Sequence, residues 1–340
     1  MTKKEFYAKL KYKNVAFGLA CSLLLILAVG SAVGKQSEKT DKPAKAESSS
    51  AEQKEEPESP EPTQNTYTQG RGATDFKYIE VRNETALHQG LLMPYAGDED
   101  YLGGRPEGLE SVYEHLFDDK GNQLAYTRSI YVYLTGETLE HFNALITDFK
   151  TQKNHNDLMI ADGYVPETLD MKDNEYWTED YTKALKCDEH YLGTSIDLKV
   201  YKGDGSYPDL TNEGDYAWVY ENLPAYGFIL RYPEGKQDIT GNDGYSNHIR
   251  FVGYPDSQII YDKELTLEEY IEELKKYDYK NELILTDTHG GRYCVYYVPA
   301  DEKGRTTNIP VPIKADGELK YRISGDGDSG FVVSCMLDKP

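Results

Sequence analysis

Two histidines and one aspartate occur in local settings that suit the ligands of a metal ion. His190 precedes Asp197 by seven residues, and Gly193 between them permits a sharp turn. His248 begins a short alternating segment that continues to Phe251. A carboxylate on a strand and an imidazole on the adjoining turn are held rigidly, and a third ligand would leave one zinc position open for water. The pattern is compatible with a Zn²⁺ site and equally with the competing interpretation that these polar residues are unrelated to one another.

The segments that must position these residues form a mixture of helices and short strands. Residues 195–201 alternate between apolar and polar side chains, which is typical of a strand with one buried face. Further strands are expected at residues 158–161 and 228–232, and a short helix at 216–223. A longer helix is expected to begin at Thr138, as its N-cap, and to continue with apolar residues at helical spacing, namely Leu139, Phe142, Leu145, Ile146 and Phe149. This mixture predicts an α+β domain.

The C-terminal quarter of the sequence has a different character. A capping-box pattern at residues 266–269 predicts the start of an amphipathic helix. We divide the folded part into a main domain at 71–262, opened by a strand at 76–81, and a helix with a small β module at 263–340. The strands of that module are expected where apolar runs alternate with turns rich in glycine and proline, at residues 283–285, 293–298, 320–323 and 331–337.

An uncharged apolar segment near the N-terminus predicts a membrane anchor. Residues 15–33 contain no charged side chain, and five lysines precede them. A helix of this length spans about 28 Å, close to the thickness of a bilayer core, and the lysines mark the cytoplasmic side. The predicted order is a cytoplasmic tail at 1–14, a transmembrane helix at 15–33, and a disordered linker at 34–70 before an extracellular folded part. A cleaved signal peptide is the alternative, because residues 28–32 are rich in small side chains.

The composition limits the partners and the cross-links of the chain. With 59 acidic and 37 basic residues, the formal net charge is −22. A surface of this charge repels nucleic acid, so we expect no nucleic-acid partner and membrane contact only through the N-terminal helix. Four cysteines are too few for a disulfide scaffold. Cys294 and Cys335 lie in strand-like segments and could pair outside the cytoplasm, although nothing in their spacing fixes the geometry of a bond.

Three segments of the sequence resemble the VanY-type D-alanyl-D-alanine carboxypeptidases. These segments are EHYLGTSIDL around His190, AYGFILRYPEGKQDITG, and HIRFVG beginning at His248. The resemblance covers roughly residues 75–262 and is strongest over 188–253. It implies a zinc domain of the kind shared by lysostaphin-like peptidases, D-Ala-D-Ala peptidases and hedgehog proteins, with His190, Asp197 and His248 as the metal ligands. It also implies that the substrate is a peptidoglycan stem peptide outside the membrane.

Two substitutions set this chain apart from the family pattern. The resemblance implies a glutamate base three residues before the last histidine, where this chain has Tyr245. A phenol with an ordinary pKa near 10 is a poor base at pH 7. The family's Ser-Gly-Tyr-Arg motif, whose arginine is expected to hold the substrate's terminal carboxylate, is Asp-Gly-Tyr-Val at residues 162–165. Arg250, two residues beyond His248, is a predicted substrate contact.

Three interpretations of Tyr245 remain open. Asp243 could act as the base instead, since it has the same strand parity as Tyr245, and Gly241 and Gly244 make the loop pliable. Tyr245 could stabilise the oxyanion while zinc acidifies the water, which would leave slow hydrolysis. The pocket could also bind wall peptides without cutting them. We therefore predict a membrane-anchored extracellular zinc D-alanyl-D-alanine carboxypeptidase; the alternative is an impaired family member that only binds wall peptides.

Overall fold

The described part of the chain belongs to one compact unit, residues 62–340. The predicted tail and anchor, most of the predicted linker, and Cys187 lie outside the described residues. Within the described part, no helix has both the length and the apolar character that a membrane crossing requires. The computed structural model describes residues 64–95, 106–164, 189–314 and 317–338.

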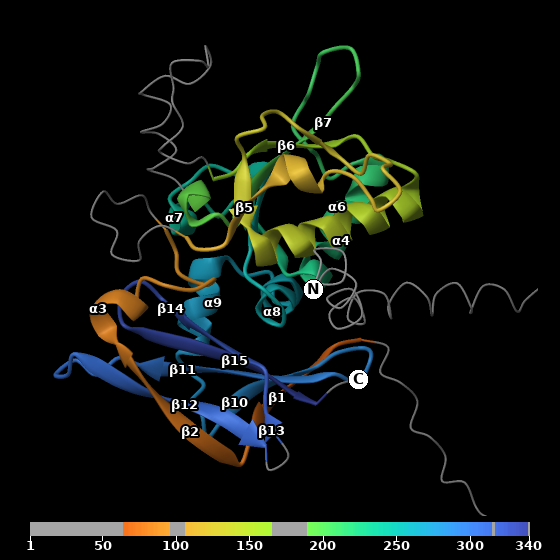
Figure 1. Ribbon diagram of the computed structural model, residues 1–340. Coiled ribbons are helices and arrows are strands. Elements are labelled where there is room, and N and C mark those ends of the chain that lie inside the picture. Colours follow the sequence, from red (N-terminus) through yellow and green to blue (C-terminus); the bar gives the residue numbers. More distant parts are fainter. Residues whose placement is uncertain (1–63, 96–105, 165–188, 315–316, 339–340) are drawn as a thin grey trace, which may run out of the picture. The chain divides into compact units, whose positions relative to one another are not determined.

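A five-stranded sheet contains two of the three predicted metal ligands (Figure 1, where β6 and β7 are labelled). Its strands follow the order β4-β6-β7-β9-β8, so β4 and β8 form its edges. Neighbouring strands are antiparallel except β4 and β6, which are parallel. The bounds are β4 Tyr126–Thr127, β6 Leu158–Asp162, β7 Ser195–Val200, β8 Phe228–Tyr232 and β9 Tyr245–Phe251.

The two faces of this sheet differ in what they contact. One face packs against α4, Gly136–Lys153, and α6, Ala217–Asn222, in an apolar core. Because successive side chains of a strand point to opposite faces, Asp197 and His248 fall on the other face. The alternation that buries the sheet against α4 therefore also sets the face on which the polar residues gather. The strand residues in this core are Leu158, Ile160, Ile196, Leu198, Val200, Phe228, Ile249 and Phe251.

Two further sheets are built mainly from the C-terminal part of the chain. Their strand orders are β1-β10-β11-β15-β14 and β13-β12-β2. Helices α8, Asp256–Asp262, and α9, Leu267–Leu274, share an apolar cluster with β10 and β11. The bounds are β1 Thr66–Gly70, β2 Asp75–Arg82, β10 Glu282–Thr286, β11 Arg292–Pro299, β12 Thr306–Lys314, β13 Gly317–Glu318, β14 Tyr321–Gly325 and β15 Gly330–Asp338.

Short elements connect these layers. Strands β3 and β5 pair with each other in a two-stranded sheet. The single-turn helix η3 leads into the turn before β7. The bounds are α3 Asn83–Ala86, β3 Leu109–Ser111, η1 Val112–His115, β5 Tyr133–Thr135, η3 Glu189–Leu192, η4 Gly214–Tyr216, η5 Leu223–Tyr226 and α7 Gln237–Thr240.

Most of the predicted elements are present, and the differences have local causes. The strands expected at 158–161, 195–201 and 228–232 are β6, β7 and β8. The capping box before α9 is confirmed, with both of its hydrogen bonds present. Helix α4 begins a turn before the predicted position, because the N-cap is Thr135, whose side chain accepts from the backbone N–H of Thr138.

The N-terminal strands do not belong where the sequence places them. The strand at 76–81 is predicted to open the main domain, but β2 pairs with β12 along its whole length. Residues 66–70 fall in the predicted disordered linker but form β1, which pairs with β10. Both strands therefore complete the C-terminal sheets. The sequence also gives no strand at β12, because Pro310 and Pro312 lack the N–H donor of a regular strand. On its other side, β12 pairs with β13 only through Ile313 and Lys314. The missing N–H groups of Pro310 and Pro312 therefore cost no hydrogen bond between these two strands.

The pairing of Cys294 with Cys335, which the sequence leaves open, is not formed, and both residues are free thiols. They are nevertheless direct neighbours, because they lie opposite each other on β11 and β15. Both are buried in an apolar cluster. A hydrogen bond with Cys335, together with burial, raises the pKa of the Cys294 thiol well above its ordinary value. Since the thiolate is the reactive form, this environment disfavours oxidation.

Candidate metal centre

The structure brings His190, Asp197 and His248 together. Their ligand atoms all lie within 4.8 Å of one another. The Oδ1 atom of Asp197 lies 2.7 Å from Nδ1 of His248 and 3.4 Å from Nε2 of His190. The two imidazole rings meet edge to face, with centroids 4.9 Å apart. Two imidazole nitrogens and one carboxylate oxygen therefore converge on a single point, as the sequence predicts.

Each of these residues has a defined local support. Asp197 of β7 and His248 of β9 are direct partners across the two strands. His190 lies on η3, and Gly193 then turns the chain into β7 with a φ of +67°. This positive φ is a conformation that residues with a Cβ rarely adopt, so the turn favours glycine. The sharp turn inferred from the sequence is thus confirmed.

The electrostatics of the group favour an ionised carboxylate. Burial alone would raise the pKa of Asp197, but hydrogen bonds with His190 and His248 lower it well below its ordinary value. Asp197 is therefore an anion at neutral pH. An anionic oxygen beside two imidazoles is a ligand set that Zn²⁺ commonly uses.

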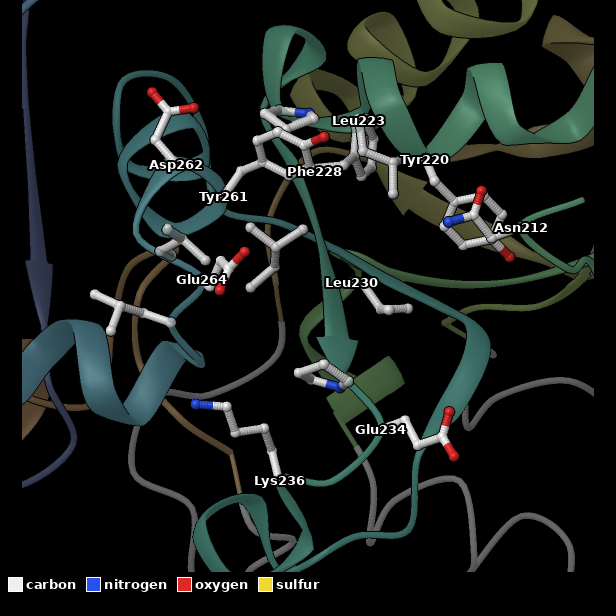
Figure 2. Close-up of a pocket in the computed structure, with 15 residues that line it drawn as sticks. Asn212, Tyr220, Leu223, Phe228, Leu230, Glu234, Lys236, Tyr261, Asp262 and Glu264 are labelled. Atoms are coloured by element: carbon white, nitrogen blue, oxygen red, sulfur yellow. The ribbon is translucent and has the colours of Figure 1, made fainter. Parts of the chain in front are cut away.

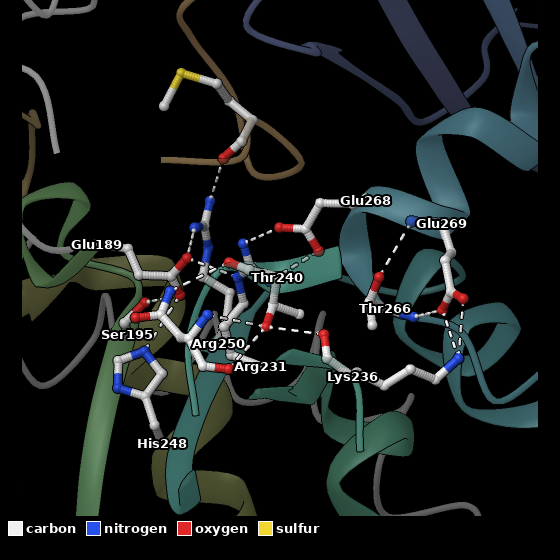
Figure 3. Close-up of polar contacts among 12 residues, drawn as sticks. Glu189, Ser195, Arg231, Lys236, Thr240, His248, Arg250, Thr266, Glu268 and Glu269 are labelled. Carbon is white, nitrogen blue, oxygen red and sulfur yellow. Dashed lines mark hydrogen bonds and ion pairs between the residues drawn. The ribbon is translucent and has the colours of Figure 1, made fainter. Parts of the chain in front are cut away.

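A buried carboxylate, Glu189, lies directly next to this group and is absent from the sequence-based candidates. It bonds to Ser195, His248 and two arginines, Arg231 and Arg250 (Figure 3). Burial alone would raise the pKa of Glu189, but the two guanidinium groups and His248 lower it well below its ordinary value. Its position directly before His190 is the one sequence feature that could have identified it.

The predicted substrate contact of Arg250 does not agree with its position. The Arg250 side chain is 0% exposed, and its guanidinium bonds to Glu189 and to the carbonyl oxygens of Leu91 and Met93. These three partners hold the side chain inside the protein. A substrate could reach it only after those bonds were broken, so we assign Arg250 a structural role.

The two candidate bases lie at the rim of the sheet. Asp243 is exposed in the loop before β9. Tyr245 begins β9 opposite Tyr232 and is 49% exposed. The ring of Tyr232 contacts both neighbours, with centroids 6.1 Å from Tyr245 and 5.0 Å from His248. The ring of Tyr232 therefore lies between Tyr245 and the metal group. The catalytic roles predicted for Tyr245 and for Asp243 stay predictions.

A bulge in β6 turns Asp162 to the face that carries Asp197. The register runs from Ile160 opposite Leu198 directly to Asp162 opposite Asp197, which leaves one extra residue in β6. Arg128, just after β4, lies 3.5 Å from the Asp162 carboxylate, and its side chain is 43% exposed. Since side chains of directly opposed residues lie only about 5 Å apart at Cβ, Asp162 stands beside Asp197, and Arg128 pairs with Asp162 from the β4 side.

A groove of about 610 Å³ lies along the free edge of β8 and is separate from the metal group (Figure 2). Leu230 of β8 lines it together with Tyr220, Tyr261 and the acidic residues Glu234 and Glu264. None of the three predicted ligands lines this groove. The site defined by the histidines and the aspartate is therefore located by its chemistry and not by this groove.

Comparisons with known proteins agree with this site. The family model "VanY: D-alanyl-D-alanine carboxypeptidase" matches residues 168–254, which include all three predicted ligands. A D-alanyl-D-alanine carboxypeptidase of Enterococcus faecium is 30% identical over 204 residues, or 60% of this chain and 61% of that protein. The bifunctional D-Ala-D-Ala dipeptidase and D-Ala-D-Ala carboxypeptidase VanXYC of Enterococcus gallinarum is 33% identical over 150 residues, or 41% of this chain and 77% of that protein.

A solved structure shares the fold. The vancomycin resistance D,D-dipeptidase VanXYg, in complex with a D-Ala-D-Ala phosphinate analog, aligns with a TM-score of 0.60 and 26% identity, over 77% of this chain and 100% of its own. The His-Asp-His group is a possible site for zinc in this chain. The family match, the relatives and the shared fold lead to one conclusion. This chain belongs to the VanY family of D-alanyl-D-alanine carboxypeptidases.

Proposed function

We propose that this protein is a zinc carboxypeptidase of the D-alanyl-D-alanine type that acts on peptidoglycan stem peptides. The convergence of His190, Asp197 and His248 from three separate elements is the observation that supports it. Tetrahedral zinc with bonds of about 2.1 Å needs ligand atoms roughly 3.4 Å apart. The 3.4 Å between His190 and Asp197 matches this value, and the 2.7 Å between His248 and Asp197 is a hydrogen-bond length. All three ligand atoms lie within 4.8 Å of one another, so small side-chain shifts fit them to the metal.

Different residues of the chain bind the metal and transfer the proton at this site. We assign Nε2 of His190, Oδ1 of Asp197 and Nδ1 of His248 as the zinc ligands. When bound, zinc supplies a Lewis acid for the scissile carbonyl and lowers the pKa of a water molecule. Proton transfer then falls to a residue at the rim, either Tyr245 or Asp243, because the glutamate expected there is absent.

The second candidate function is binding of wall peptides without hydrolysis. It is favoured by one observation: position 245 holds a half-exposed phenol in place of a carboxylate. Either function would take place outside the cell. The uncharged segment at 15–33 and the lysines before it support a membrane anchor with the folded part on the extracellular side.

The proposed function predicts both metal binding and release of D-alanine. We expect the full-length protein, purified in detergent, to bind about one zinc per chain, as three protein ligands require. It should release D-alanine from an acylated peptide that ends in D-Ala-D-Ala, and chelator treatment should stop the release. Zinc binding and peptide binding with no release would favour the second candidate. A protein that takes up no zinc after reconstitution would rule out both.

Arg128 is positioned to hold the free carboxylate of such a peptide. It is a half-exposed cation, held by Asp162 on the face that carries the Asp197 ligand. A guanidinium can bind a carboxylate with two parallel hydrogen bonds. The Asp-Gly-Tyr-Val motif at residues 162–165 ends in valine where the family has arginine, so this motif supplies no cation.

Arg128→Gln is expected to weaken binding of a D-Ala-D-Ala peptide by roughly 10–100-fold, the loss of a charge-assisted hydrogen bond. Binding of the same peptide with a C-terminal amide should change little, because the amide carries no charge. Calorimetry on the zinc-loaded protein measures both. Arg292→Gln is the matched control, since Arg292 is also 43% exposed and paired with an aspartate, Asp338, in the C-terminal sheet. An unchanged preference for the acid over the amide in Arg128→Gln would contradict this role.

A further inference from the structure

The surroundings of Glu189 fill every acceptor position of its carboxylate (Figure 3). Oε1 accepts from Nε of Arg231 at 2.8 Å and from Nη1 of Arg250 at 2.9 Å. Oε2 accepts from Oγ of Ser195 at 2.9 Å and lies 3.3 Å from Nε2 of His248. A carboxylate has about four lone-pair positions, and all four have a partner here. Glu189 is therefore fixed in one orientation.

This arrangement determines how the ring of His248 is presented. Its Nε2 faces Glu189, and its Nδ1 faces Asp197 at 2.7 Å, so a carboxylate lies at each edge of the ring. The ring is also packed between His190 and Tyr232. A hydrogen bond at one nitrogen of a metal-bound histidine fixes the tautomer and the ring orientation. Glu189 thus directs Nδ1 toward the other two ligands.

Glu189 is connected in turn to the C-terminal module through Arg231. The other two nitrogens of this guanidinium bond to Glu268 of α9, at 3.0 Å and 2.5 Å, in a two-pronged pair. Arg231 is 2% exposed, whereas Glu268 is 25% exposed. The apolar side of α9 packs in the cluster that contains β10 and β11. A continuous set of contacts therefore runs from α9 through Arg231 and Glu189 to His248.

Glu189 does not have the placement of a general base. Its carboxylate faces the nitrogen of His248 that points away from Asp197. Two guanidinium groups occupy its other oxygen, and the side chain is 0% exposed. Its chemistry is that of a support for the ring.

We propose that Glu189 is a positioning residue of the metal centre and that Glu268 extends this support into the C-terminal module. The module would then have a defined task, because α9 helps to hold His248 ready for metal. This inference rests on the proposed zinc site. It concerns how the site is built and is independent of whether the protein hydrolyses its peptide.

The test is zinc affinity, measured on the zinc-free full-length protein by competition with a chromophoric chelator. Glu189→Gln is expected to raise the zinc dissociation constant by roughly 10–100-fold, as for other residues that support a metal-bound histidine. Glu268→Gln should raise it by a smaller factor, about 3-fold or more, because Glu268 acts through Arg231. The absorption spectrum of the Co²⁺-substituted protein should shift in Glu189→Gln, since it reports the ligand geometry directly.

Glu269→Gln is the matched control, because Glu269 is the next residue of α9 and holds Lys236 at 2.9 Å instead of Arg231. Glutamine retains the capping box, so α9 should stay intact. Its zinc affinity should equal that of the wild type. Equal affinities in wild type, Glu189→Gln and Glu268→Gln, with each protein folded by circular dichroism, would overturn the inference and leave the zinc site in place. If Glu189→Gln does not fold, the zinc affinities of Glu268→Gln and Glu269→Gln are compared. Weaker binding in Glu268→Gln supports the inference, and equal binding overturns it. A wild type that binds no zinc would remove the proposed function as well.

Discussion

Replacing Tyr245 with glutamate is expected to raise the rate of D-alanine release at pH 7 by about 10²–10⁴-fold, the usual contribution of a positioned general base. The phenol is a poor base at this pH, whereas a carboxylate near a zinc-bound water can accept its proton. The assay is steady-state release of D-alanine from an acylated D-Ala-D-Ala peptide by the zinc-loaded protein. Most of the gain should appear in kcat, because position 245 is not assigned to peptide binding.

The position of Tyr245 supports this substitution. Its ring and the ring of His248 both contact Tyr232, so a side chain at 245 starts close to the metal group. In a regular strand, residues three apart point to opposite faces, but the register of β8 and β9 shifts between Leu230 and Tyr232. This irregularity permits a side chain at 245 to approach the face that carries His248.

Two further variants distinguish the effect of adding a carboxylate base at position 245 from the effect of removing the phenol. Tyr245→Gln has the length of the glutamate without its basicity, so its rate should stay near that of the wild type. A rate in Tyr245→Glu that does not exceed the rate in Tyr245→Gln would contradict the prediction. Asp243→Asn tests the other candidate: if this change abolishes release in the wild type, Asp243 is already the base and the gain from glutamate should be small.

The metal group was predictable from the sequence because its elements are short and regular. Alternation along residues 195–201 places Asp197 on the face opposite the buried residues, and the same rule applies to His248. The turn at Gly193 needed only a glycine at the right place. These inferences depend on a few neighbouring residues, whereas the grouping of His248 with Asp197, 51 residues away, is implied by the resemblance to the VanY-type family.

The supporting residues were not predictable, because their partners are far apart in the sequence. Glu189 is 42 residues from Arg231 and 61 from Arg250, and Arg231 is 37 from Glu268. No local pattern distinguishes these charged residues from solvated ones. The same reason explains why β2 was assigned to the main domain, since its partner β12 lies more than two hundred residues later. Pairings of this kind depend on the tertiary fold.

Removing the carboxylate of Asp197 is expected to abolish metal binding. Asp197→Ala should lower the zinc content from about one per chain to background, because it deletes the anionic member of a three-residue ligand set. Release of D-alanine, where the wild type shows it, should fall on the order of 10³-fold or more, since the metal contributes several kcal/mol to the transition state. Zinc content by elemental analysis and the same release assay measure the two effects.

The control for Asp197→Ala must separate loss of a ligand from loss of a charge on β7. Asp209→Asn serves this purpose, because Asp209 pairs with Lys199 of the same strand and is 56% exposed at its side chain. Its zinc content should equal that of the wild type. In zinc-free protein the two imidazoles lower the pKa of Asp197, so the ionised carboxylate stabilises the fold above its ordinary pKa, and this contribution is lost as the pH falls. Some loss of thermal stability in Asp197→Ala is therefore expected, and zinc content must be compared well below its melting temperature. A folded Asp197→Ala that still binds one zinc with unchanged affinity would show that the metal lies elsewhere.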